Sequence, residues 1–118
     1  MQHKLLSATR ITSDKVVNDA GEHLGNIHDL MVDLDSGRIT YAAVSFGGFL
    51  GASEKLFAVP WEAFLVSSDD KTFILNVPKQ KLMEAPGFDK NHWPDAGDTK
   101  WLEEVYRYYG CAPFWTCA

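Results

Sequence analysis

The sequence predicts a mainly β protein: a small, antiparallel and strongly bent β-barrel with short helical segments and a C-terminal helix. The first observation is a long hairpin over residues 24–48, where two runs rich in aliphatic and aromatic residues flank Asp35-Ser36-Gly37. The second is that the later arm of this hairpin is apolar on both faces. The third is a pair of further short strand patterns, at 57–59 and 73–77, bounded by proline or polar turn residues.

Composition limits the class of protein. A chain of 118 residues suits one domain, and 46% hydrophobic with 23% charged residues is typical of a globular protein. The net charge of −5 argues against nucleic-acid binding, because the phosphate backbone selects clustered Lys and Arg. No apolar run approaches the ~20 residues that span a bilayer, and the first ten residues lack the apolar centre of a secretory signal. We therefore expect a cytoplasmic protein without a membrane span.

The chain is expected to begin disordered and then to enter a short strand. Residues 1–13 are polar and aperiodic apart from Leu5, Leu6 and Ile11. Residues 14–17 have the pattern of a first strand. A turn containing Asn, Asp and Gly follows, since these residues tolerate the left-handed conformations that turns require.

The first arm of the hairpin alternates between aliphatic and mostly acidic residues. The aliphatic positions are Leu30, Val32 and Leu34. A period of two puts these side chains on one face of a strand and the carboxylates on the other. Leu24 shares that parity but Ile27 does not, so we expect a β-bulge near Asn26 or His28. Gly37 suits the left-handed position of a three-residue loop.

The second arm, residues 39–46, carries apolar side chains on both faces. Ile39, Tyr41 and Ala43 share one face, and Ala42, Val44 and Phe46 share the other. A strand that is apolar on both sides requires cover on both sides. A small closed barrel with another element packed outside it supplies that cover.

Short elements fill the middle of the chain. The glycine-rich stretch 47–53 lacks the Lys-Ser/Thr of a phosphate-binding loop, so we interpret it as a long connection. Pro60 ends a strand and begins one helical turn to Phe64. A hairpin with a polar turn at 67–71 leads to residue 77, and Pro78 opens a short helix that ends near Glu84.

The last part of the chain is predicted to be a loop followed by a helix. Phe88 and Trp93 anchor the loop at 87–97. Asp98 is a good N-cap for a helix over 99–109, and Gly110 ends it. The apolar stripe of this helix predicts that one face packs on the rest of the protein. The stripe consists of Trp101, Leu102, Val105, Tyr108 and Tyr109.

These patterns, in this order, resemble the PRC-barrel domain. This small β-barrel is shared by the cytoplasmic part of the photosynthetic reaction-centre H subunit and the C-terminal domain of RimM-type ribosome maturation factors. The matching segments are GNIHDLMVD at 25–33, GRI at 37–39, YAAV at 41–44, FAVPW at 57–61 and FIL at 73–75. The resemblance implies a PRC-barrel domain over 7–84. Residues 85–118 resemble the tail of free-standing bacterial PRC-barrel proteins, implying an extension with a loop and helix that pack on the barrel.

The resemblance implies a non-enzymatic scaffold or protein–protein interaction module without a cofactor. The H subunit has a transmembrane helix and RimM-type factors have an N-terminal domain, and this chain shows neither, so membrane anchoring and ribosome assembly do not follow. Fold alone does not fix function. The alternative is a barrel that binds a small ligand or a divalent cation.

Asp29, Asp33 and Asp35 are the candidate cation ligands. Alternate residues of a strand share a face, and carboxylate oxygens suit Ca²⁺ or Mg²⁺. The segment from Asp33 to Gly37 is similar to the start of a helical calcium loop, but its twelfth position is Val44 rather than Glu. A solvated strand face is therefore the favoured interpretation of these aspartates.

Neither the histidines nor the cysteines predict a catalytic or metal site. His28 lies on the hairpin beside Asp29, but adjacent strand residues point to opposite faces, so the two would not pair unless a bulge intervenes. Cys111 and Cys117 would close only a short loop, which stabilises little, so we expect two free thiols. We predict that the protein is not an enzyme.

Aromatic residues near the C-terminus are the candidate interaction residues: Trp93, Trp101, Tyr108 and Tyr109. They bury large apolar areas when they pack, and any part that stays exposed forms a partner surface. We expect a homo-oligomer, with a dimer favoured, formed through an exposed strand edge or through this aromatic region. The sequence does not identify a further protein partner.

Overall fold

The computed structural model of the protein describes residues 5, 7–12, 14–45, 55–66, 72–85, 87–89, 92–95 and 98–112. Within these residues the chain is mainly β, as predicted. The elements are α1 (Ala8–Ile11), β1 (Lys15–Val17), β2 (His23–Val32), β3 (Ile39–Ser45), β4 (Lys55–Pro60), the 3₁₀ turn η1 (Trp61–Ala63), β5 (Phe64–Val66), β6 (Thr72–Leu75), α2 (Lys79–Met83), β7 (Gly87–Asp89) and α3 (Thr99–Tyr108).

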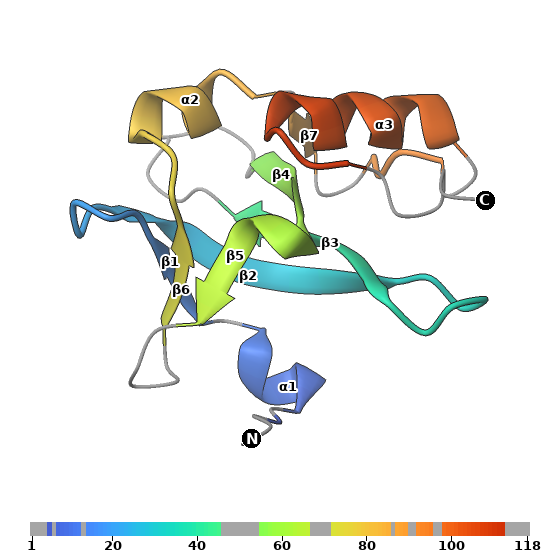
Figure 1. Cartoon of the computed structure of the whole chain (residues 1–118), viewed down its shortest axis with the longest axis horizontal. Helices are drawn as coiled ribbons and strands as arrows, with labels where there is room; N and C mark the ends of the chain where they lie inside the picture. The colour runs from blue at the N-terminus through green and yellow to red at the C-terminus, as the bar shows by residue number, and fades with distance from the viewer. Residues whose placement is uncertain are drawn as a thin grey trace.

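The described strands form one sheet in the order β5-β6-β1-β2-β3-β4-β7. Neighbouring strands run antiparallel except for β1 and β6, which are parallel and pair through Val16 and Phe73. In Figure 1 the long β2–β3 hairpin crosses the molecule, and α2 and α3 lie above the strands. The central hairpin predicted at 24–48 is thus the middle of the sheet.

The prediction of a closed, strongly bent barrel is wrong. Among the described residues no ladder joins the edge strands β5 and β7, and the sheet stays open without strong bending. The outer edge of β4 is already paired with β7, Leu56 opposite Phe88, so β5 has no strand edge there to close against. The C-terminal extension therefore takes the place that a closing strand would need.

The predicted bulge and turn of the hairpin are confirmed. The register of β2 against β3 shifts between Ile27 and Asp29, which makes His28 the extra residue. Gly37 has a φ of 76°, the left-handed conformation expected of it in the loop. A separate irregularity in the pairing of β1 with β2 passes over Leu24. The side chains of Leu24 and Ile27 are both buried in the core despite their different sequence parity.

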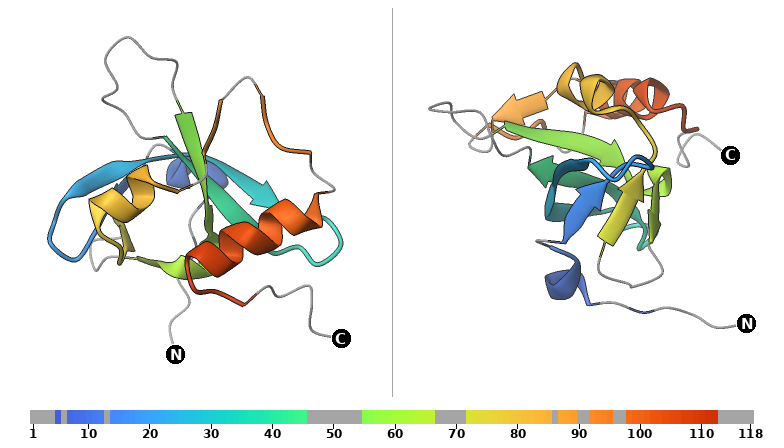
Figure 2. Two further views of the ribbon diagram at one scale, coloured as in Figure 1. Left: turned by 90° about the horizontal axis from the view of Figure 1, so that it is seen from above. Right: turned by 90° about the vertical axis from the view of Figure 1, so that its left-hand side faces the viewer.

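Strand β3 is covered on both faces, as its composition predicted. Ala42 and Val44 enter the main core. Tyr41 lies on the opposite face, where it packs with Ala58 of β4 and Val105 of α3. The element outside the sheet is therefore α3, which Figure 2 shows lying across the strands.

The prediction that Leu30, Val32 and Leu34 share one aliphatic face is wrong at the far end of the hairpin arm. Val32 is 51% exposed and Leu34 is 92% exposed. The hairpin extends beyond the part of β3 that pairs with β4, which ends at Tyr41, so no further strand covers its tip. A second register shift between Met31 and Val32 also breaks the alternation.

The main core gathers side chains from eight elements and from a residue that follows one of them. Its buried members are Ile11, Val16, Leu24, Ile27, Ala42, Val44, Phe57, Val59, Phe64, Phe73, Leu75, Leu82 and Ala85. Trp61 stacks at its edge with ring-centre distances of 5.7 Å to Phe64 and 5.6 Å to Phe73. This aromatic group fixes the turn η1, which reverses the chain between β4 and β5.

Two elements differ from the sequence prediction. The segment expected to begin disordered contains α1, because Ser7 caps its N-terminus by accepting a hydrogen bond from the Arg10 N–H and Ile11 is buried. Part of the expected loop at 87–97 is strand β7. The glycine-rich stretch 47–53, the turn at 67–71 and Cys117 lie outside the described residues.

A candidate protein-binding groove

A groove of about 470 Å³ lies between the tip of the β2–β3 hairpin and the N-terminal half of α3. In Figure 1 α3 lies above this end of the sheet. The residues that line the groove come from three segments of the chain. They are Met31, Val32, Asp33, Leu34, Asp35, Thr40, Tyr41, Asp95, Asp98, Thr99, Trp101 and Leu102.

Helix α3 is capped at its start and tied to the sheet in its second half. At its start the Asp98 carboxylate accepts a hydrogen bond from the Trp101 N–H at 3.0 Å, as predicted for an N-cap. In its last half Tyr106 is fully buried, and its hydroxyl donates to the Thr40 carbonyl oxygen at 2.5 Å. Thr40 lines the groove, so this bond fixes the groove wall to the helix.

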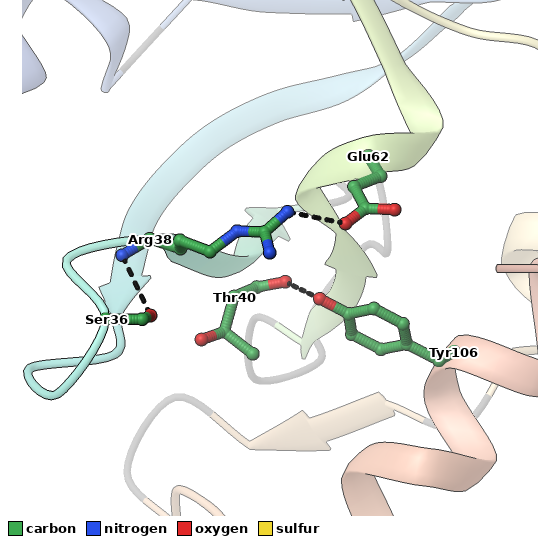
Figure 3. A network of polar contacts seen from close by, with 5 residues as sticks. All are labelled: Ser36, Arg38, Thr40, Glu62 and Tyr106. Atoms are coloured by element: carbon green, nitrogen blue, oxygen red, sulfur yellow. Dashed lines mark hydrogen bonds and ion pairs between the residues drawn. The ribbon is translucent and has the colours of Figure 1, made fainter. Parts of the chain in front are cut away.

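Polar contacts beside the groove link the loop end of the hairpin to η1, as Figure 3 shows. The Arg38 side chain pairs with Glu62 of η1 at 3.4 Å, and the Arg38 N–H donates to the Ser36 hydroxyl at 3.2 Å. Both side chains of the ion pair are about half exposed, so the pair contributes little stability by itself. It joins η1 to the hairpin loop, which carries two of the groove's four aspartates, Asp33 and Asp35.

The floor of the groove is aromatic and already packed. Tyr41 and Trp101 meet edge to face with ring centres 5.7 Å apart, a favoured aromatic geometry. Burial, with a smaller contribution from the charge of Asp29, raises the pKa of Tyr41 to about 12. The Tyr41 hydroxyl is therefore neutral across the physiological pH range, and the floor presents no charge of its own.

The rim of the groove combines carboxylates with exposed aliphatic side chains. Asp33 and Asp35 come from the hairpin tip, and Asp95 and Asp98 come from the chain leading into α3. The Asp33 carboxylate accepts a hydrogen bond from the Asp35 N–H, which shapes the tip. Beside them Leu34 projects almost fully into solvent.

The three aspartates proposed as cation ligands do not form one group. Asp29 lies in the strand, exposed, and its carboxylate accepts the N–H of its neighbour Leu30. Asp33 and Asp35 lie at the groove instead. Among the residues that the structure describes, no three His, Cys, Asp or Glu side chains are grouped as metal ligands. Within the described residues, Asp29 is therefore not brought together with Asp33 and Asp35.

The four aromatic candidates lie mainly within the fold. Trp93 stacks on Phe88 at 4.9 Å, and Tyr108 donates a hydrogen bond to the Lys81 carbonyl at 2.6 Å. Tyr109 packs against both the main core and the α3 cluster (Tyr41, Ala58 and Val105 with their neighbours). Trp101 alone among the four lines the groove.

The remaining candidates lie apart from the groove. His28 is exposed at the bulge, and no catalytic role was predicted for it. The Cys111 thiol is half-buried after α3, and burial, with a smaller contribution from Glu62, raises its pKa. A raised pKa reduces the thiolate fraction and so makes this thiol less reactive.

Sequence reasoning missed the groove as a unit. It identified Asp33, Asp35 and Trp101 separately, but not Asp95 or Asp98 as their neighbours. Asp98 lies 57 positions after Tyr41 in the sequence, and only the packing of α3 brings them to one surface. The available signals were the two acidic residues shortly before an amphipathic helix, Asp95 and Asp98, and the single Leu34 between two aspartates in the hairpin loop.

Comparison with known proteins finds a family whose model matches most of the chain. The family model of the PRC-barrel domain matches residues 3–82. No curated protein sequence matches the chain. In the described part of the chain, no helix has both the length and the apolar character needed to cross a membrane.

Proposed function

The chain belongs to the PRC-barrel domain family, and from this premise we propose that it is a non-enzymatic interaction module. Its contact surface is the groove between the β2–β3 tip and α3. The observation that carries this proposal is the exposure of Leu34, 92%, beside a preformed aromatic floor. Exposed apolar residues gathered at a hollow are typical of a binding site, whereas isolated ones are ordinary surface.

Site-specific photo-cross-linking in an extract of the native host tests this function. A photoreactive residue replaces Leu34 in one variant and Asp19, in the exposed turn after β1, in a control variant. We expect position 34 to form a discrete cross-linked protein band that excess unlabelled wild-type protein removes. Identical patterns at the two positions, or no band at position 34, would contradict the proposal.

Self-association through a sheet edge is the second candidate, and β5 favours it. This strand pairs only with β6 among the described strands, and Leu65 and Val66 are 64% and 42% exposed. Antiparallel pairing of two copies of this edge would give a symmetric dimer that covers these side chains.

Light scattering across a concentration series tests the dimer. We expect a mass that rises from monomer to dimer with concentration, and a shift back to monomer in the Leu65→Lys variant. Lysine on an edge strand opposes edge-to-edge pairing because of its charge. A strict monomer at millimolar concentration would remove the dimer hypothesis and leave the groove proposal standing.

A further inference from the structure

We infer that the occupant of the groove is a short basic, amphipathic segment of a partner protein, in which Lys or Arg side chains flank one bulky apolar side chain. This inference rests on the proposed function and adds the chemistry of the partner. It follows from three properties of the groove: the sign of its charge, the exposure of its apolar rim and its size.

Charge selects a cationic partner. All four charged residues that line the groove are aspartates: Asp33, Asp35, Asp95 and Asp98. The nearest basic residue of the hairpin, Arg38, is turned toward Glu62, and Lys100 is exposed on α3 without lining the groove. Like charges gathered in a concave surface produce a field that attracts the opposite charge and speeds its association.

The apolar rim selects a partner that also brings a large hydrophobic side chain. Leu34 and Val32 are exposed, while Trp101 and Leu102 continue the apolar surface inward. Exposed ion pairs are each worth only about 0.2–1 kcal/mol, so the carboxylates alone would hold a ligand weakly. Burying one large aliphatic or aromatic side chain contributes about 1.5–3 kcal/mol. We therefore assign the affinity to the apolar contact and the choice of partner to the charges.

The size of the groove fits a segment rather than a domain face. Its volume of about 470 Å³ lies within the ~300–1,000 Å³ range of pockets that enclose drug-sized ligands. A space of this size holds a few side chains of an extended or helical peptide. The exposed position of Leu34 at the mouth leaves room for the rest of the segment to pass outside.

The probe for this inference is a library of random twelve-residue peptides displayed on phage, selected on the immobilised full chain. We expect enriched sequences to carry Lys or Arg within three residues of Leu, Ile, Phe or Trp. Enrichment of acidic or uncharged sequences would overturn the charge assignment. Failure to enrich any sequence would overturn the inference itself.

Variants then locate the binding site of the best selected peptide, measured by fluorescence anisotropy. Leu34→Ser and Asp35→Asn each alter an exposed tip residue. Leu34→Ser should weaken binding about tenfold or more, and Asp35→Asn should weaken it about two- to fivefold. The matched controls, Leu65→Ser on β5 and Asp19→Asn in the turn after β1, make the same chemical changes elsewhere and should leave affinity unchanged. Equal losses in variants and controls would place the peptide outside the groove.

Charge reversal and added salt separate the charged contribution to peptide binding from the apolar one. Asp35→Lys should weaken a basic peptide further than Asp35→Asn does, and it should improve binding of the same peptide with its basic residues changed to Glu. Raising the salt from 0.05 to 0.5 M should weaken the wild-type complex, because exposed charges are screened over a few ångströms at high salt. Salt-independent binding would overturn the charged part of the inference.

The two proposals fail separately. A cross-link at position 34 together with selected peptides that lack basic residues would keep the interaction module and reject a basic partner. If the protein cross-linked at position 34 is a second copy of this chain, the basic-segment assignment is likewise rejected. Selective, salt-sensitive peptide binding without any cross-linked protein would instead show a competent groove and reject the proposed cellular function.

Discussion

At the scale of residues, two buried tyrosine hydroxyls in α3 and the turn after it have different surroundings. Tyr106 donates its hydrogen bond to the Thr40 carbonyl across 66 positions of sequence. Tyr109 contacts both apolar clusters, but its buried hydroxyl has no hydrogen-bond partner among the described residues. A buried polar group stabilises the fold only when it is paired. The two side chains therefore have opposite effects on stability through the same functional group.

Replacing these tyrosines with phenylalanine should change stability in opposite directions. Tyr106→Phe leaves the Thr40 carbonyl unpaired and should lower the free energy of unfolding by about 1–2 kcal/mol. Tyr109→Phe removes an unpaired polar atom and should raise the free energy of unfolding by up to ~1 kcal/mol. Urea denaturation followed by fluorescence measures both. Equal destabilisation by the two substitutions would contradict this assignment of hydrogen bonds.

Buried tyrosines also predict a loss of stability in alkaline solution. Burial raises the pKa of Tyr41 and of Tyr106 to about 12, with smaller contributions from Asp29 at Tyr41 and from Glu62 and Cys111 at Tyr106. An unfolded tyrosine has a pKa of about 10. Between pH 10 and 12 the unfolded state therefore loses its proton before the folded state does, and unfolding becomes easier as pH rises.

Between pH 10 and 12, each tyrosine should lower the free energy of unfolding by at most about 1.4 kcal/mol per pH unit. Below pH 10 it should have no such effect. Urea midpoints at pH 8, 10, 10.5 and 11 measure the effect. The stability of Tyr106→Phe should fall less steeply with pH than that of wild type, by the slope of up to one bound proton, because the variant lacks one of the groups whose pKa is raised. Parallel curves for the two proteins would show that Tyr106 titrates normally in the folded state.

At the scale of elements, the hairpin is shaped by a close approach of its two strands at Gly25. A Cβ built at this position would lie 2.3 Å from the Ser45 carbonyl oxygen and 2.9 Å from the Val44 Cγ1. The opposing oxygen belongs to the backbone of β3 and cannot rotate away. Gly25 is also the first residue of the PRC-barrel pattern in the sequence, so a steric requirement explains its presence there.

Gly25→Ala should destabilise the protein by about 3 kcal/mol, at the upper end of the usual cost of overpacking. The matched control is Gly37→Ala, where φ is positive but no atom lies within 4 Å of the added Cβ. That change should cost only about 1–2 kcal/mol, the penalty for a left-handed L-residue. Thermal denaturation of both variants compares them, and equal costs would mean that β2 moves to relieve the contact.

At the scale of the whole molecule, the sequence predicted what short-range patterns encode. Apolar residues on both faces of β3 predicted its cover on both sides, Asp98 predicted the start of α3, and mixed parity predicted a bulge near Asn26 or His28. Barrel closure, the parallel pairing of β1 with β6 and the groove all depend on contacts between distant segments. No local pattern indicates that β7 occupies the edge of β4. The closed barrel was predicted from the apolar faces of β3 and from the family resemblance.

Contacts between distant segments also lead to a prediction about residues 85–118. The family match ends at residue 82, yet the outer face of β3 and β4 is covered by α3 and β7. Val105 is 1% exposed and packs with Tyr41 and Ala58 of the sheet. We therefore expect the family-matched segment and the extension to fold as one unit.

A protein truncated after residue 84 should lose its cooperative thermal transition and bind a hydrophobic dye, because Tyr41 and Ala58 lose their cover. A pair of point substitutions on α3 in the full chain gives the same test without truncation. Val105→Ala should lower the free energy of unfolding by about 2 kcal/mol, as large-to-small changes in a core do. Glu104→Ala, exposed on the same helix, should change it by less than ~0.5 kcal/mol. If the truncated protein melts at the same temperature as the full chain, the sheet is stable by itself and α3 serves only to build the groove.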